Sequence, residues 1–370
     1  MYGLFVRRHA AAATAAGDDV CVLYLHEVED IKSCGVETHV TGDPTVNEIY
    51  VYYQGSYLKA LYRGWKEVKL HWGMPDICQI NIISKNAVLP LALKLFRHTP
   101  YIITEHWSGY LPQNNAFLSA GALYKALVKT VLRHADQLLT VSPELENGMR
   151  RCGLPMPHAA HINNVVDGTF YMQAEGQEQK AESKKSVVRF VHVSCFDEQA
   201  KNVCGILNTA STLANQRTDF EIVMIGTGAD LALCRRHAAR LHLPSKIIKW
   251  TGELPPEQVA QQLHEADAFI LFSNYETAGV VLAESLAVGT PVISTPVGLA
   301  PELIDENCGI IVPVADEQAL AQAMLAIMDK KKVFDEKKMR KKAADFTQEA
   351  VGNALHDVYQ RVLESSHQTF

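Results

Sequence analysis

The sequence of 370 residues lacks several features that mark common classes of protein. It has no Cys-x-x-Cys pair, and its eight cysteines are scattered without the Cys/His spacing of a zinc finger, which predicts buried thiols in a reducing compartment. No apolar run approaches the ~18 residues of a membrane span, and no basic-then-apolar signal precedes a cleavage site. These absences lead us to expect a cytoplasmic protein.

The chain also lacks a large excess of positive or negative charge. The chain carries 35 Lys and Arg against 41 Asp and Glu, a formal net charge of −6. Proteins that bind the phosphate backbone broadly carry a basic surplus. We therefore expect no nucleic-acid partner.

The remaining composition is that of a folded protein of two domains. Hydrophobic residues make up 48% and charged residues 21%, and 370 residues exceed the size of one typical domain. Strand-like runs rich in Val and Ile alternate with helical periods, which predicts an α/β protein with parallel sheets. The expected strands are 20–25, 48–53, 76–82, 101–104, 137–141, 187–193, 221–225, 247–251, 268–272, 291–294 and 309–312, and the expected N-terminal helices are 58–69, 87–96 and 116–134.

One segment marks the boundary between the two halves. Residues 174–186 (AEGQEQKAESKKS) lose nearly all large apolar side chains, and a second α/β series begins immediately afterwards. We predict two Rossmann-like, doubly wound domains that face each other across a cleft, residues 1–166 and 167–346. Ligands of such sheets bind beyond the carboxyl ends of the strands.

The most informative motif is a pair of glutamates in the second half. Glu276 follows a buried strand, Gly279 opens a helix, and Glu284 lies about one and a half turns into that helix, which ends at Gly289. Backbone N–H groups at the start of a helix bind phosphate without any side chain. The segment therefore predicts a diphosphate site between two carboxylates.

This Glu-x7-Glu segment, with its Gly289-Thr-Pro291 tail, resembles the retaining, family-4-type glycosyltransferases (glycosyl transferases group 1) of the GT-B fold, in their bacterial form. The resemblance implies that Glu276 contacts hydroxyls of the donor sugar near the reacting carbon and that Glu284 binds the ribose hydroxyls of the nucleotide. The donor-binding residues that it further implies are Thr277, Ala278, Gly279, Val280, Gly252, Leu254 and Gly3.

Two more catalytic candidates come from the same resemblance. Lys201 matches the lysine of the basic pair that neutralises the donor diphosphate, while the usual arginine is absent near Cys195 and Phe196. His106, in the run Thr-Glu-His-Trp-Ser-Gly, matches the histidine that touches the donor sugar in bacterial members. An ordinary solvated lysine and a packed histidine are the alternatives for these two positions.

The two ends of the chain are compared with the family as well. Members begin with a strand and a glycine-containing loop, whereas this chain starts at Met1-Tyr-Gly3, so we expect the first strand of the acceptor-side domain to be missing. Such an absence would expose two strand edges or leave a gap. The final segment, 347–370, is expected to form a helix that packs back on the first domain, as the family's last helix does.

The resemblance implies a hexosyltransferase that moves a sugar from a nucleotide-diphospho-sugar, UDP- or GDP-linked, to the hydroxyl of a glycan or lipid-linked acceptor with retention of configuration. Synthesis of cell-surface polysaccharide or lipopolysaccharide is the expected setting. No Asp-x-Asp occurs, so we expect no metal and no cofactor. The alternatives are a catalytically silent nucleotide-sugar or glycan binding protein, and a nucleotide-sugar epimerase or hydrolase on the same fold.

Peripheral contact with the inner face of a membrane is a further possibility. Over residues 58–72, Lys59, Arg63 and Lys66 share one helical face, whereas Leu58, Leu61, Trp65, Val68 and Trp72 share another. The pattern suits a helix at a lipid interface, and it equally suits a helix that packs on the core with one wet side.

Overall fold

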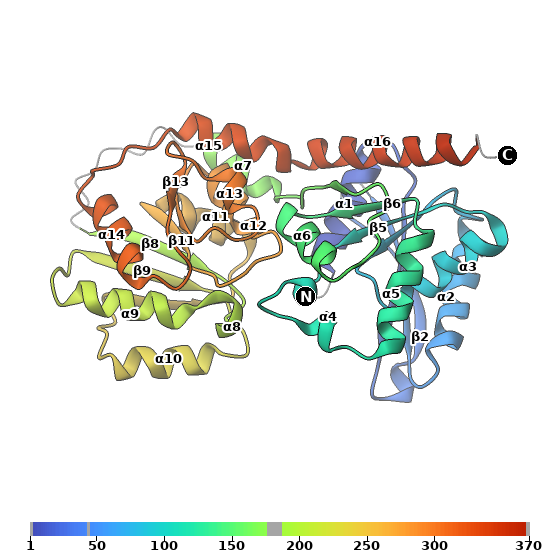
Figure 1. Cartoon of the computed structure of the whole chain (residues 1–370), viewed down its shortest axis with the longest axis horizontal. Helices are drawn as coiled ribbons and strands as arrows, with labels where there is room; N and C mark the ends of the chain where they lie inside the picture. The colour runs from blue at the N-terminus through green and yellow to red at the C-terminus, as the bar shows by residue number, and fades with distance from the viewer. Residues whose placement is uncertain (1–2, 43–44, 176–186, 368–370) are drawn as a thin grey trace.

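The computed structural model describes residues 3–42, 45–175 and 187–367. Helices and strands alternate along the chain, and they form two α/β domains that lie next to each other along the longest axis (Figure 1). This arrangement confirms the predicted fold class. The segment 174–186 lies, except for its first two residues, outside the described residues.

The N-terminal domain divides its strands between two sheets. One has three strands in the order β1-β3-β2, and the other has four parallel strands in the order β4-β5-β6-β7. The elements are α1 (Leu4–Ala15), β1 (Cys21–Glu27), η1 (Ile31–Ser33), β2 (Gly35–Thr41), β3 (Val46–Tyr53), α2 (Tyr57–His71), β4 (Cys78–Asn81), η2 (Lys85–Ala87), α3 (Val88–Arg97), β5 (Tyr101–Glu105), η3 (Ser108–Tyr110), α4 (Ala116–Ser119), α5 (Ala122–His134), β6 (Gln137–Thr140), α6 (Pro143–Arg151) and β7 (Ala160–His161).

Two sequence predictions for this domain are wrong. The expected strands omit β2, which pairs antiparallel with β3 and whose side chains are half-buried or exposed. It lacks the continuous apolar run that identifies a buried strand. The single helix expected over 116–134 is two helices, because the backbone is extended at Ala120 and Gly121.

The C-terminal domain is one fully parallel sheet of six strands, in the order β10-β9-β8-β11-β12-β13. Every side chain of β9 and β11 is buried, as expected for strands with helices on both faces. The elements are α7 (Gly168–Glu175), β8 (Val188–Val193), α8 (Glu198–Lys201), α9 (Val203–Ala214), β9 (Phe220–Ile225), α10 (Leu231–Arg240), β10 (Ile248–Gly252), α11 (Pro256–Glu265), β11 (Ala268–Leu271), α12 (Val280–Ala287), β12 (Val292–Ser294), α13 (Ala300–Leu303), β13 (Gly309–Ile311), α14 (Glu317–Met328), α15 (Glu336–Ala343), η4 (Ala344–Phe346) and α16 (Gln348–His367).

The order of this sheet fixes where a ligand can bind. The chain builds outward from β8 through β9 to β10, and then returns to the other side of β8 to build β11, β12 and β13. The loops after β8 and β11 therefore diverge to opposite faces, which leaves a crevice at the carboxyl ends of these two neighbouring strands.

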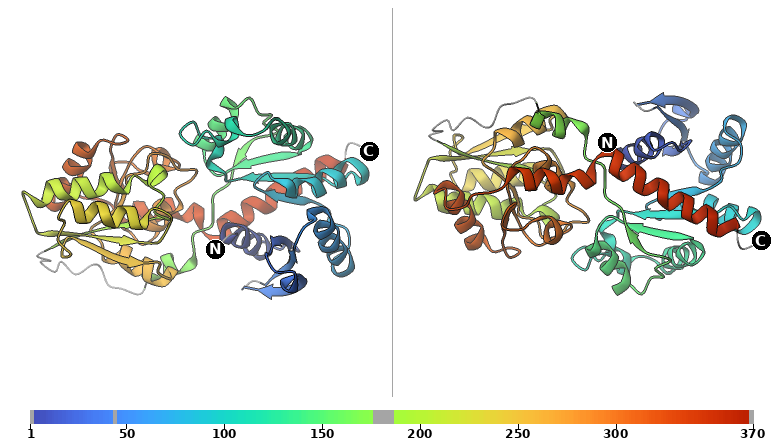
Figure 2. Two further views of the ribbon diagram at one scale, coloured as in Figure 1. Left: turned by 90° about the horizontal axis from the view of Figure 1, so that it is seen from below. Right: turned by 90° about the horizontal axis from the view of Figure 1, so that it is seen from above.

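The last helix joins the two domains. From η4 and α15 in the C-terminal domain, α16 runs back over the N-terminal domain and lies against α1 (Figures 1 and 2). The contact is close, because a Cβ built on Gly352 of α16 would come within 2.2 Å of the carbonyl oxygen of Ala12. None of the helices in the described ranges is long and apolar enough to span a lipid bilayer.

Candidate active site

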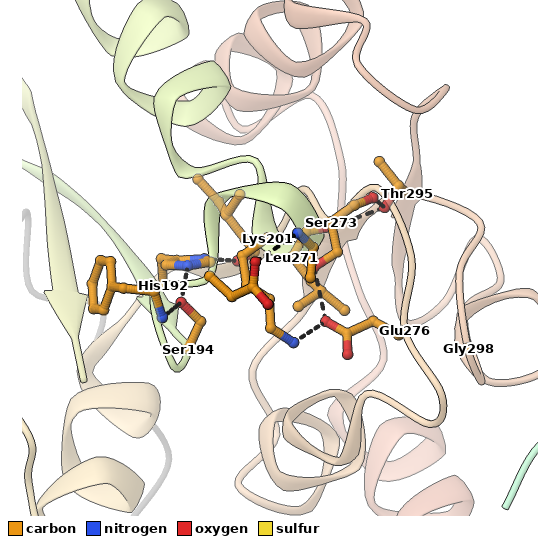
Figure 3. A network of polar contacts seen from close by, with 12 residues as sticks. His192, Ser194, Lys201, Leu271, Ser273, Glu276, Thr295 and Gly298 are labelled. Atoms are coloured by element: carbon orange, nitrogen blue, oxygen red, sulfur yellow. Dashed lines mark hydrogen bonds and ion pairs between the residues drawn. The ribbon is translucent and has the colours of Figure 1, made fainter. Parts of the chain in front are cut away.

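The neighbouring strands β8 and β11 bring a lysine and a glutamate together at the point where the strand order of the sheet reverses, which we call the switch point. Lys201 ends the short helix α8 after β8, and Glu276 lies in the loop after β11. The Nζ atom of Lys201 is 2.5 Å from Oε1 of Glu276, and Ser273 Oγ donates to the same oxygen at 2.8 Å (Figure 3). The two candidates lie 75 positions apart in the sequence and are in direct contact.

The local backbone structure holds the loops that carry Lys201 and Glu276 at the carboxyl ends of β8 and β11. Asp197 caps α8 by accepting a hydrogen bond from Ala200 N–H, and Asn202 then adopts a left-handed conformation (φ 48°) that ends α8 and starts α9. On the other side, Gly279 has φ 72° and precedes α12. Only glycine adopts such a backbone readily, which accounts for its place between the loop and the helix.

The pair is a charged one. Burial acts to lower the pKa of Lys201, but the carboxylate of Glu276 overrides it and holds that pKa above its ordinary value. The side chains of Lys201 and Glu276 are only 17% and 9% exposed. The site therefore presents a fixed ammonium and a fixed carboxylate at the edge of the sheet.

A buried histidine supports the loop after β8, and no sequence motif pointed to it. His192 Nδ1 lies 2.9 Å from the carbonyl oxygen of Ile270 and its Nε2 lies 2.8 Å from Ser194 Oγ (Figure 3). Because the carbonyl can only accept, Nδ1 carries the proton and Nε2 accepts from the serine. Burial lowers the pKa of His192 to about 4, so the ring is neutral and ties β8 to β11.

The residues between the two glutamates form the start of α12. Thr277 and Ala278 precede Gly279, and the carbonyl oxygen of Ala278 accepts from Leu299 N–H at 2.9 Å. Val280 is the first helical residue. The N–H of Leu282 donates to the carbonyl oxygen of Gly279 at 2.9 Å, so the N–H groups of Val280 and Val281 are the ones in this turn without a partner within the helix. They lie beside Glu276 and offer an anion site of the kind predicted.

Glu284, the second glutamate of the motif, is half-buried on α12. Burial raises the pKa of Glu284 to about 7, Arg8 acts to lower it, and Asp167 acts to raise it. Among the described residues no hydrogen bond or ion pair reaches its carboxylate. It is free to accept hydrogen bonds from a ligand.

The remaining donor-side candidates occupy the neighbouring strand ends. Gly252 ends β10 with φ 76°, and its carbonyl oxygen accepts from Gly226 N–H at 2.7 Å. Leu254, two residues later, is half-buried. Cys195, at the place of the missing arginine, is an exposed free thiol.

The N-terminal candidates lie apart from the Lys201–Glu276 pair. His106 follows β5, and its ring packs 4.1 Å from that of Phe5 and 5.8 Å from that of His9. Burial lowers the pKa of His106 well below its usual value, and its Nε2 is buried without a hydrogen-bond partner in the described part of the chain. Gly3 caps α1 in a left-handed conformation beside Tyr24. No direct contact links either residue to Glu276 among the described residues.

Residues at the start of helix α6 of the N-terminal domain contact the loops of the site, and the sequence analysis did not predict these contacts. Ser142 Oγ donates to the carbonyl oxygen of Thr277, and Glu144 accepts from Gly298 N–H. Glu276 and Glu144 are also coupled electrostatically, since burial and then the Glu276 charge raise the pKa of Glu144 against the pull of the Gly298 N–H. The two domains are in contact across the donor-side loop.

One set of potential metal ligands occurs in the described ranges, formed by Glu198, Cys204 and Cys234. Glu198 accepts from the N–H groups of Val203 and Cys204 at 2.9 and 3.0 Å, so it caps α9. Burial and the Glu198 carboxylate raise the pKa of both thiols to about 12. Helix capping explains the position of Glu198, and the raised pKa keeps the thiols of Cys204 and Cys234 protonated at neutral pH.

Comparisons with known proteins match both domains. Residues 2–164 match the family model of the glycosyl transferase 4-like domain, and residues 173–349 match that of the glycosyl transferases group 1. The chain is 24% identical over 205 residues to N-acetyl-alpha-D-glucosaminyl L-malate synthase of Bacillus anthracis, covering 55% of this chain and 52% of the relative. It is 36% identical over 147 residues to the amylovoran biosynthesis glycosyltransferase AmsK of Erwinia amylovora, covering 38% and 36%. The matches thus span about half or less of these relatives.

Solved structures share the fold over more of the chain. Sucrose-phosphate synthase from Thermosynechococcus elongatus superimposes with a TM-score of 0.78 at 20% identity, covering 99% of this chain and 94% of the other. Anabaena HepE in complex with UDP and glucose gives a TM-score of 0.66 at 17% identity, covering 85% and 86%. At these identities the likeness concerns the fold alone.

Proposed function

Because the chain belongs to the glycosyl transferases group 1, with a glycosyl transferase 4-like domain before it, we propose that it transfers a hexosyl group from a nucleotide-diphospho-sugar to an acceptor hydroxyl with retention of configuration. The observation that carries the proposal is the contact between Lys201 and Glu276 at the switch point, beside the start of α12. This arrangement combines positive charge for a diphosphate with a carboxylate for sugar hydroxyls.

Each group has a role in that reaction. The transition state of glycosyl transfer resembles an oxocarbenium ion, and the departing diphosphate gains negative charge. Lys201 and the N–H groups of the first turn of α12 stabilise that charge, and the leaving phosphate oxygen takes the acceptor proton. Glu276 holds the sugar, and His106, which follows β5, contacts the sugar from the N-terminal domain. No step of this reaction uses a metal, so we expect turnover with a chelator present.

The donor is proposed to be UDP- or GDP-linked, and the acceptor a glycan or lipid-linked sugar of a cell-surface polysaccharide. Supporting observations are that HepE, which shares the fold, holds UDP and glucose, and that AmsK serves amylovoran biosynthesis. Glu284 is suited to the nucleotide ribose because its carboxylate is unpartnered among the described residues and can accept two hydroxyls.

A thermal-shift panel with UDP, GDP, ADP, CDP and TDP tests the donor site. A ligand at 100 times its Kd adds about 2.7 kcal/mol, which moves the midpoint of a domain of this size by about 5–10 °C. We expect one nucleotide to do so, Glu284→Ala to abolish the shift, and Glu257→Ala, at an exposed glutamate on α11, to retain it. A cooperative transition that no nucleotide moves would remove the proposal.

The stereochemistry requires a separate measurement. With the donor base identified, proton NMR of the early product from an α-linked donor gives the anomeric configuration directly. We expect an α-linked product, formed equally with and without EDTA. A β-linked product would refute retention, and loss of turnover with EDTA would refute metal independence.

We also propose peripheral contact with anionic membranes through α2. The expected separation of basic and apolar faces is wrong at Leu58, which lies on the exposed side, whereas the other apolar residues of that face are buried or half-buried: Leu61, Trp65, Val68 and Trp72. Ala60, Leu61 and Gly64 are the buried residues of the helix. Gly64 is needed there, since a Cβ would come within 2.7 Å of Leu23 Cδ1. The exposed face of α2 carries Leu58, Tyr62 and Leu70, 65–70% exposed, among Lys59, Arg63, Lys66 and Lys69.

Exposed apolar side chains among basic ones suit an anionic lipid surface. The one acidic residue of α2, Glu67, is half-buried and lies 3.6 Å from His71. We expect the chain to sediment with phosphatidylglycerol-containing vesicles and not with phosphatidylcholine alone. Each lysine contributes about 1 kcal/mol at such a surface, so Lys59→Gln with Lys66→Gln reduces the bound fraction by about 10–30-fold. Lys246→Gln, at an exposed lysine of the other domain, is the control. Equal binding to both vesicles would contradict the assignment.

A further inference from the structure

One face of the three-stranded sheet in the N-terminal domain carries aromatic side chains. Successive side chains of a strand point to opposite faces, so Tyr24 and His26 of β1 share a face, and so do Tyr50 and Tyr52 of β3. The register pairs Tyr24 with Tyr50 and His26 with Tyr52, which places all four rings on the same side of the sheet. We call these four residues the aromatic face.

The opposite face of this sheet is the one that packs on the core. Ile49, Val51 and Tyr53 of β3 are buried there. Helix α2 covers them so closely that a Cβ built on Gly64 would come within 2.7 Å of Leu23 Cδ1. The aromatic face is thus not needed to hold the sheet onto α2, and its four rings are only half-buried.

The four rings lie close together with nearly parallel planes. The centroids of Tyr24 and Tyr50 are 4.8 Å apart and their planes are inclined by 17°, while those of His26 and Tyr52 are 5.6 Å apart and inclined by 23°. Along the two strands the centroids are 6.2 Å and 6.3 Å apart. His39 of β2 packs edge-on against Tyr50 at 5.4 Å. Each ring is therefore held in place by its neighbours.

A buried carboxylate fixes one end of the aromatic face. The side chain of Glu48 is fully buried, and Arg7 of α1 donates to both of its oxygens, at 2.9 and 3.3 Å. The hydroxyls of Tyr50 and Tyr24 donate to it at 3.1 and 3.4 Å, and that of Thr41 at 2.9 Å. These bonds hold the two tyrosine rings by their hydroxyl groups.

The other end of the aromatic face is open. His26 and Tyr52 lie near the carboxyl ends of β1 and β3. The Tyr52 hydroxyl and the His26 imidazole make no hydrogen bond to another residue in the described part of the chain. Aromatic rings with a few free polar groups are typical of small-molecule sites. A hexopyranose presents the complementary pattern, since its C–H groups lie on the faces of its ring and its hydroxyl groups lie around the rim.

The charges around the aromatic face favour a neutral ligand. The Arg7 guanidinium is used by Glu48 and by the Tyr50 hydroxyl, to which it donates at 2.7 Å. The exposed carboxylate of Glu37 lies 3.1 Å from His39 Nε2 at the rim. A nucleic acid binds chiefly through free cations that contact its phosphates. A chain of neutral hexoses has no such requirement.

The aromatic face is continuous with the proposed sugar site. A Cβ built on Gly3 would lie 3.4 Å from Tyr24 Cε1, and the ring of Phe5 packs 4.1 Å from that of His106. The first turn of α1 therefore separates the aromatic face from His106, the residue proposed to contact the donor sugar. Helix α1 begins next to the junction of the two domains (Figure 2).

We propose that the aromatic face binds the acceptor glycan, with one hexopyranose unit against Tyr24 and Tyr50 and the next against His26 and Tyr52. This rests on the proposed function, in which a glycan accepts the sugar. The spacing of the rings along the strands is comparable to the length of one such unit. The free polar groups of Tyr52 and His26 then bind hydroxyl groups of the second unit.

The test uses an array of neutral mono- to hexasaccharides built from hexopyranose units, followed by isothermal titration calorimetry with the glycans that the wild type retains. We expect disaccharides to bind more tightly than monosaccharides, because two pairs of rings are present. Tyr52→Leu and His26→Leu keep apolar bulk but remove a ring, and each should weaken binding by about 3–10-fold. Tyr52→Phe keeps the ring and should bind more tightly than Tyr52→Leu. Phe96→Leu, at an exposed phenylalanine of α3, is the matched control and should change nothing.

A second measurement is independent of whether the leucine variants fold. The wild-type chain is labelled with fluorotyrosine, and the fluorine NMR signals of Tyr24, Tyr50 and Tyr52 are assigned through their Tyr→Phe variants. These signals should shift when the bound disaccharide is added, whereas that of Tyr171 in the C-terminal domain should not. Unshifted signals of the three tyrosines would overturn the proposal.

The outcomes separate this proposal from the proposed function. A wild type that retains none of these glycans would overturn the aromatic face as a glycan site, whereas the nucleotide thermal-shift panel decides the proposed function. Glycan binding that both leucine variants retain would overturn it as well, because the glycan would then lie elsewhere. If a leucine variant also loses nucleotide binding, its fold is damaged and the fluorine spectrum of the wild type decides. Glycan binding without nucleotide binding would defeat the proposed function and leave the aromatic face as a glycan-binding surface.

Discussion

Replacing Lys201 by Met is the perturbation that most directly probes the pair at the switch point. The substitution keeps an apolar stem of similar length and removes the ammonium that lies 2.5 Å from Glu276 Oε1. Among the described residues, Ser273 Oγ is then the one side chain that still donates to Glu276, whose own side chain is 9% exposed. The carboxylate becomes a nearly buried charge without a counterion.

The magnitude follows from that geometry. Breaking a buried ion pair on one side costs about 3–5 kcal/mol, and we take about 3 because both groups border a crevice that water can reach. For a domain of this size this lowers the melting midpoint by about 6–12 °C. Glu276→Gln leaves the Lys201 ammonium unpaired and should cost about as much. The double variant has no unpaired charge, so it should lose only about 1–2 kcal/mol rather than the sum of about 6.

The wild type, the two single variants and the double variant form a double-mutant cycle. Differential scanning calorimetry of these four proteins measures it through the unfolding transition of the C-terminal domain. The raised pKa of Lys201 keeps the pair charged at neutral pH, and its stabilisation is lost only as the pH rises above the ordinary lysine value, so the coupling should be constant from pH 6 to 9. Additive single and double variants would refute the reasoning. Under the proposed function, Lys201→Met should also lower kcat by about 100–1000-fold.

Two further predictions concern the packing of the N-terminal domain. Gly352→Ala should destabilise the contact of α16 with α1 by several kcal/mol, because the new Cβ would lie 2.2 Å from the Ala12 carbonyl oxygen. Thermal unfolding measures this, with Gly121→Ala as the control, where a Cβ meets nothing within 4 Å. Equal melting points of the two variants would contradict the prediction. Burial lowers the pKa of His9 to about 4, and its Nε2 lies 3.0 Å from the Asn163 carbonyl oxygen. The contribution of neutral His9 to the free energy of unfolding is therefore fully present above pH 6.5, roughly the pKa of histidine in the unfolded chain. It declines by about 3 kcal/mol as the pH falls to 4. Urea unfolding of His9→Gln should show a correspondingly flatter profile over this range, and an unchanged slope would contradict it.

The α/β class and the motif of the two glutamates could be predicted from the amino-acid sequence alone. Glu276, Gly279 and Glu284 belong to one strand–loop–helix unit, and the geometry of such a unit depends on contacts between near neighbours. The buried strands were visible because parallel strands covered on both faces are apolar throughout. Strand β2 could not be predicted from the sequence, because its side chains are half-buried or exposed and it forms a strand only by pairing with β3.

Contacts between residues far apart in the sequence could not be predicted, because they depend on how the elements pack. The order of the sheet places β8 next to β11, and this brings Lys201 to Glu276 although 75 positions separate them. The contacts of Ser142 with Thr277 and of Arg8 with Asp167 span 135 and 159 positions and join different domains. A serine or an arginine of this kind has no local signature, since its role is set by the partner that the fold places opposite it: a backbone carbonyl for Ser142 and a carboxylate for Arg8.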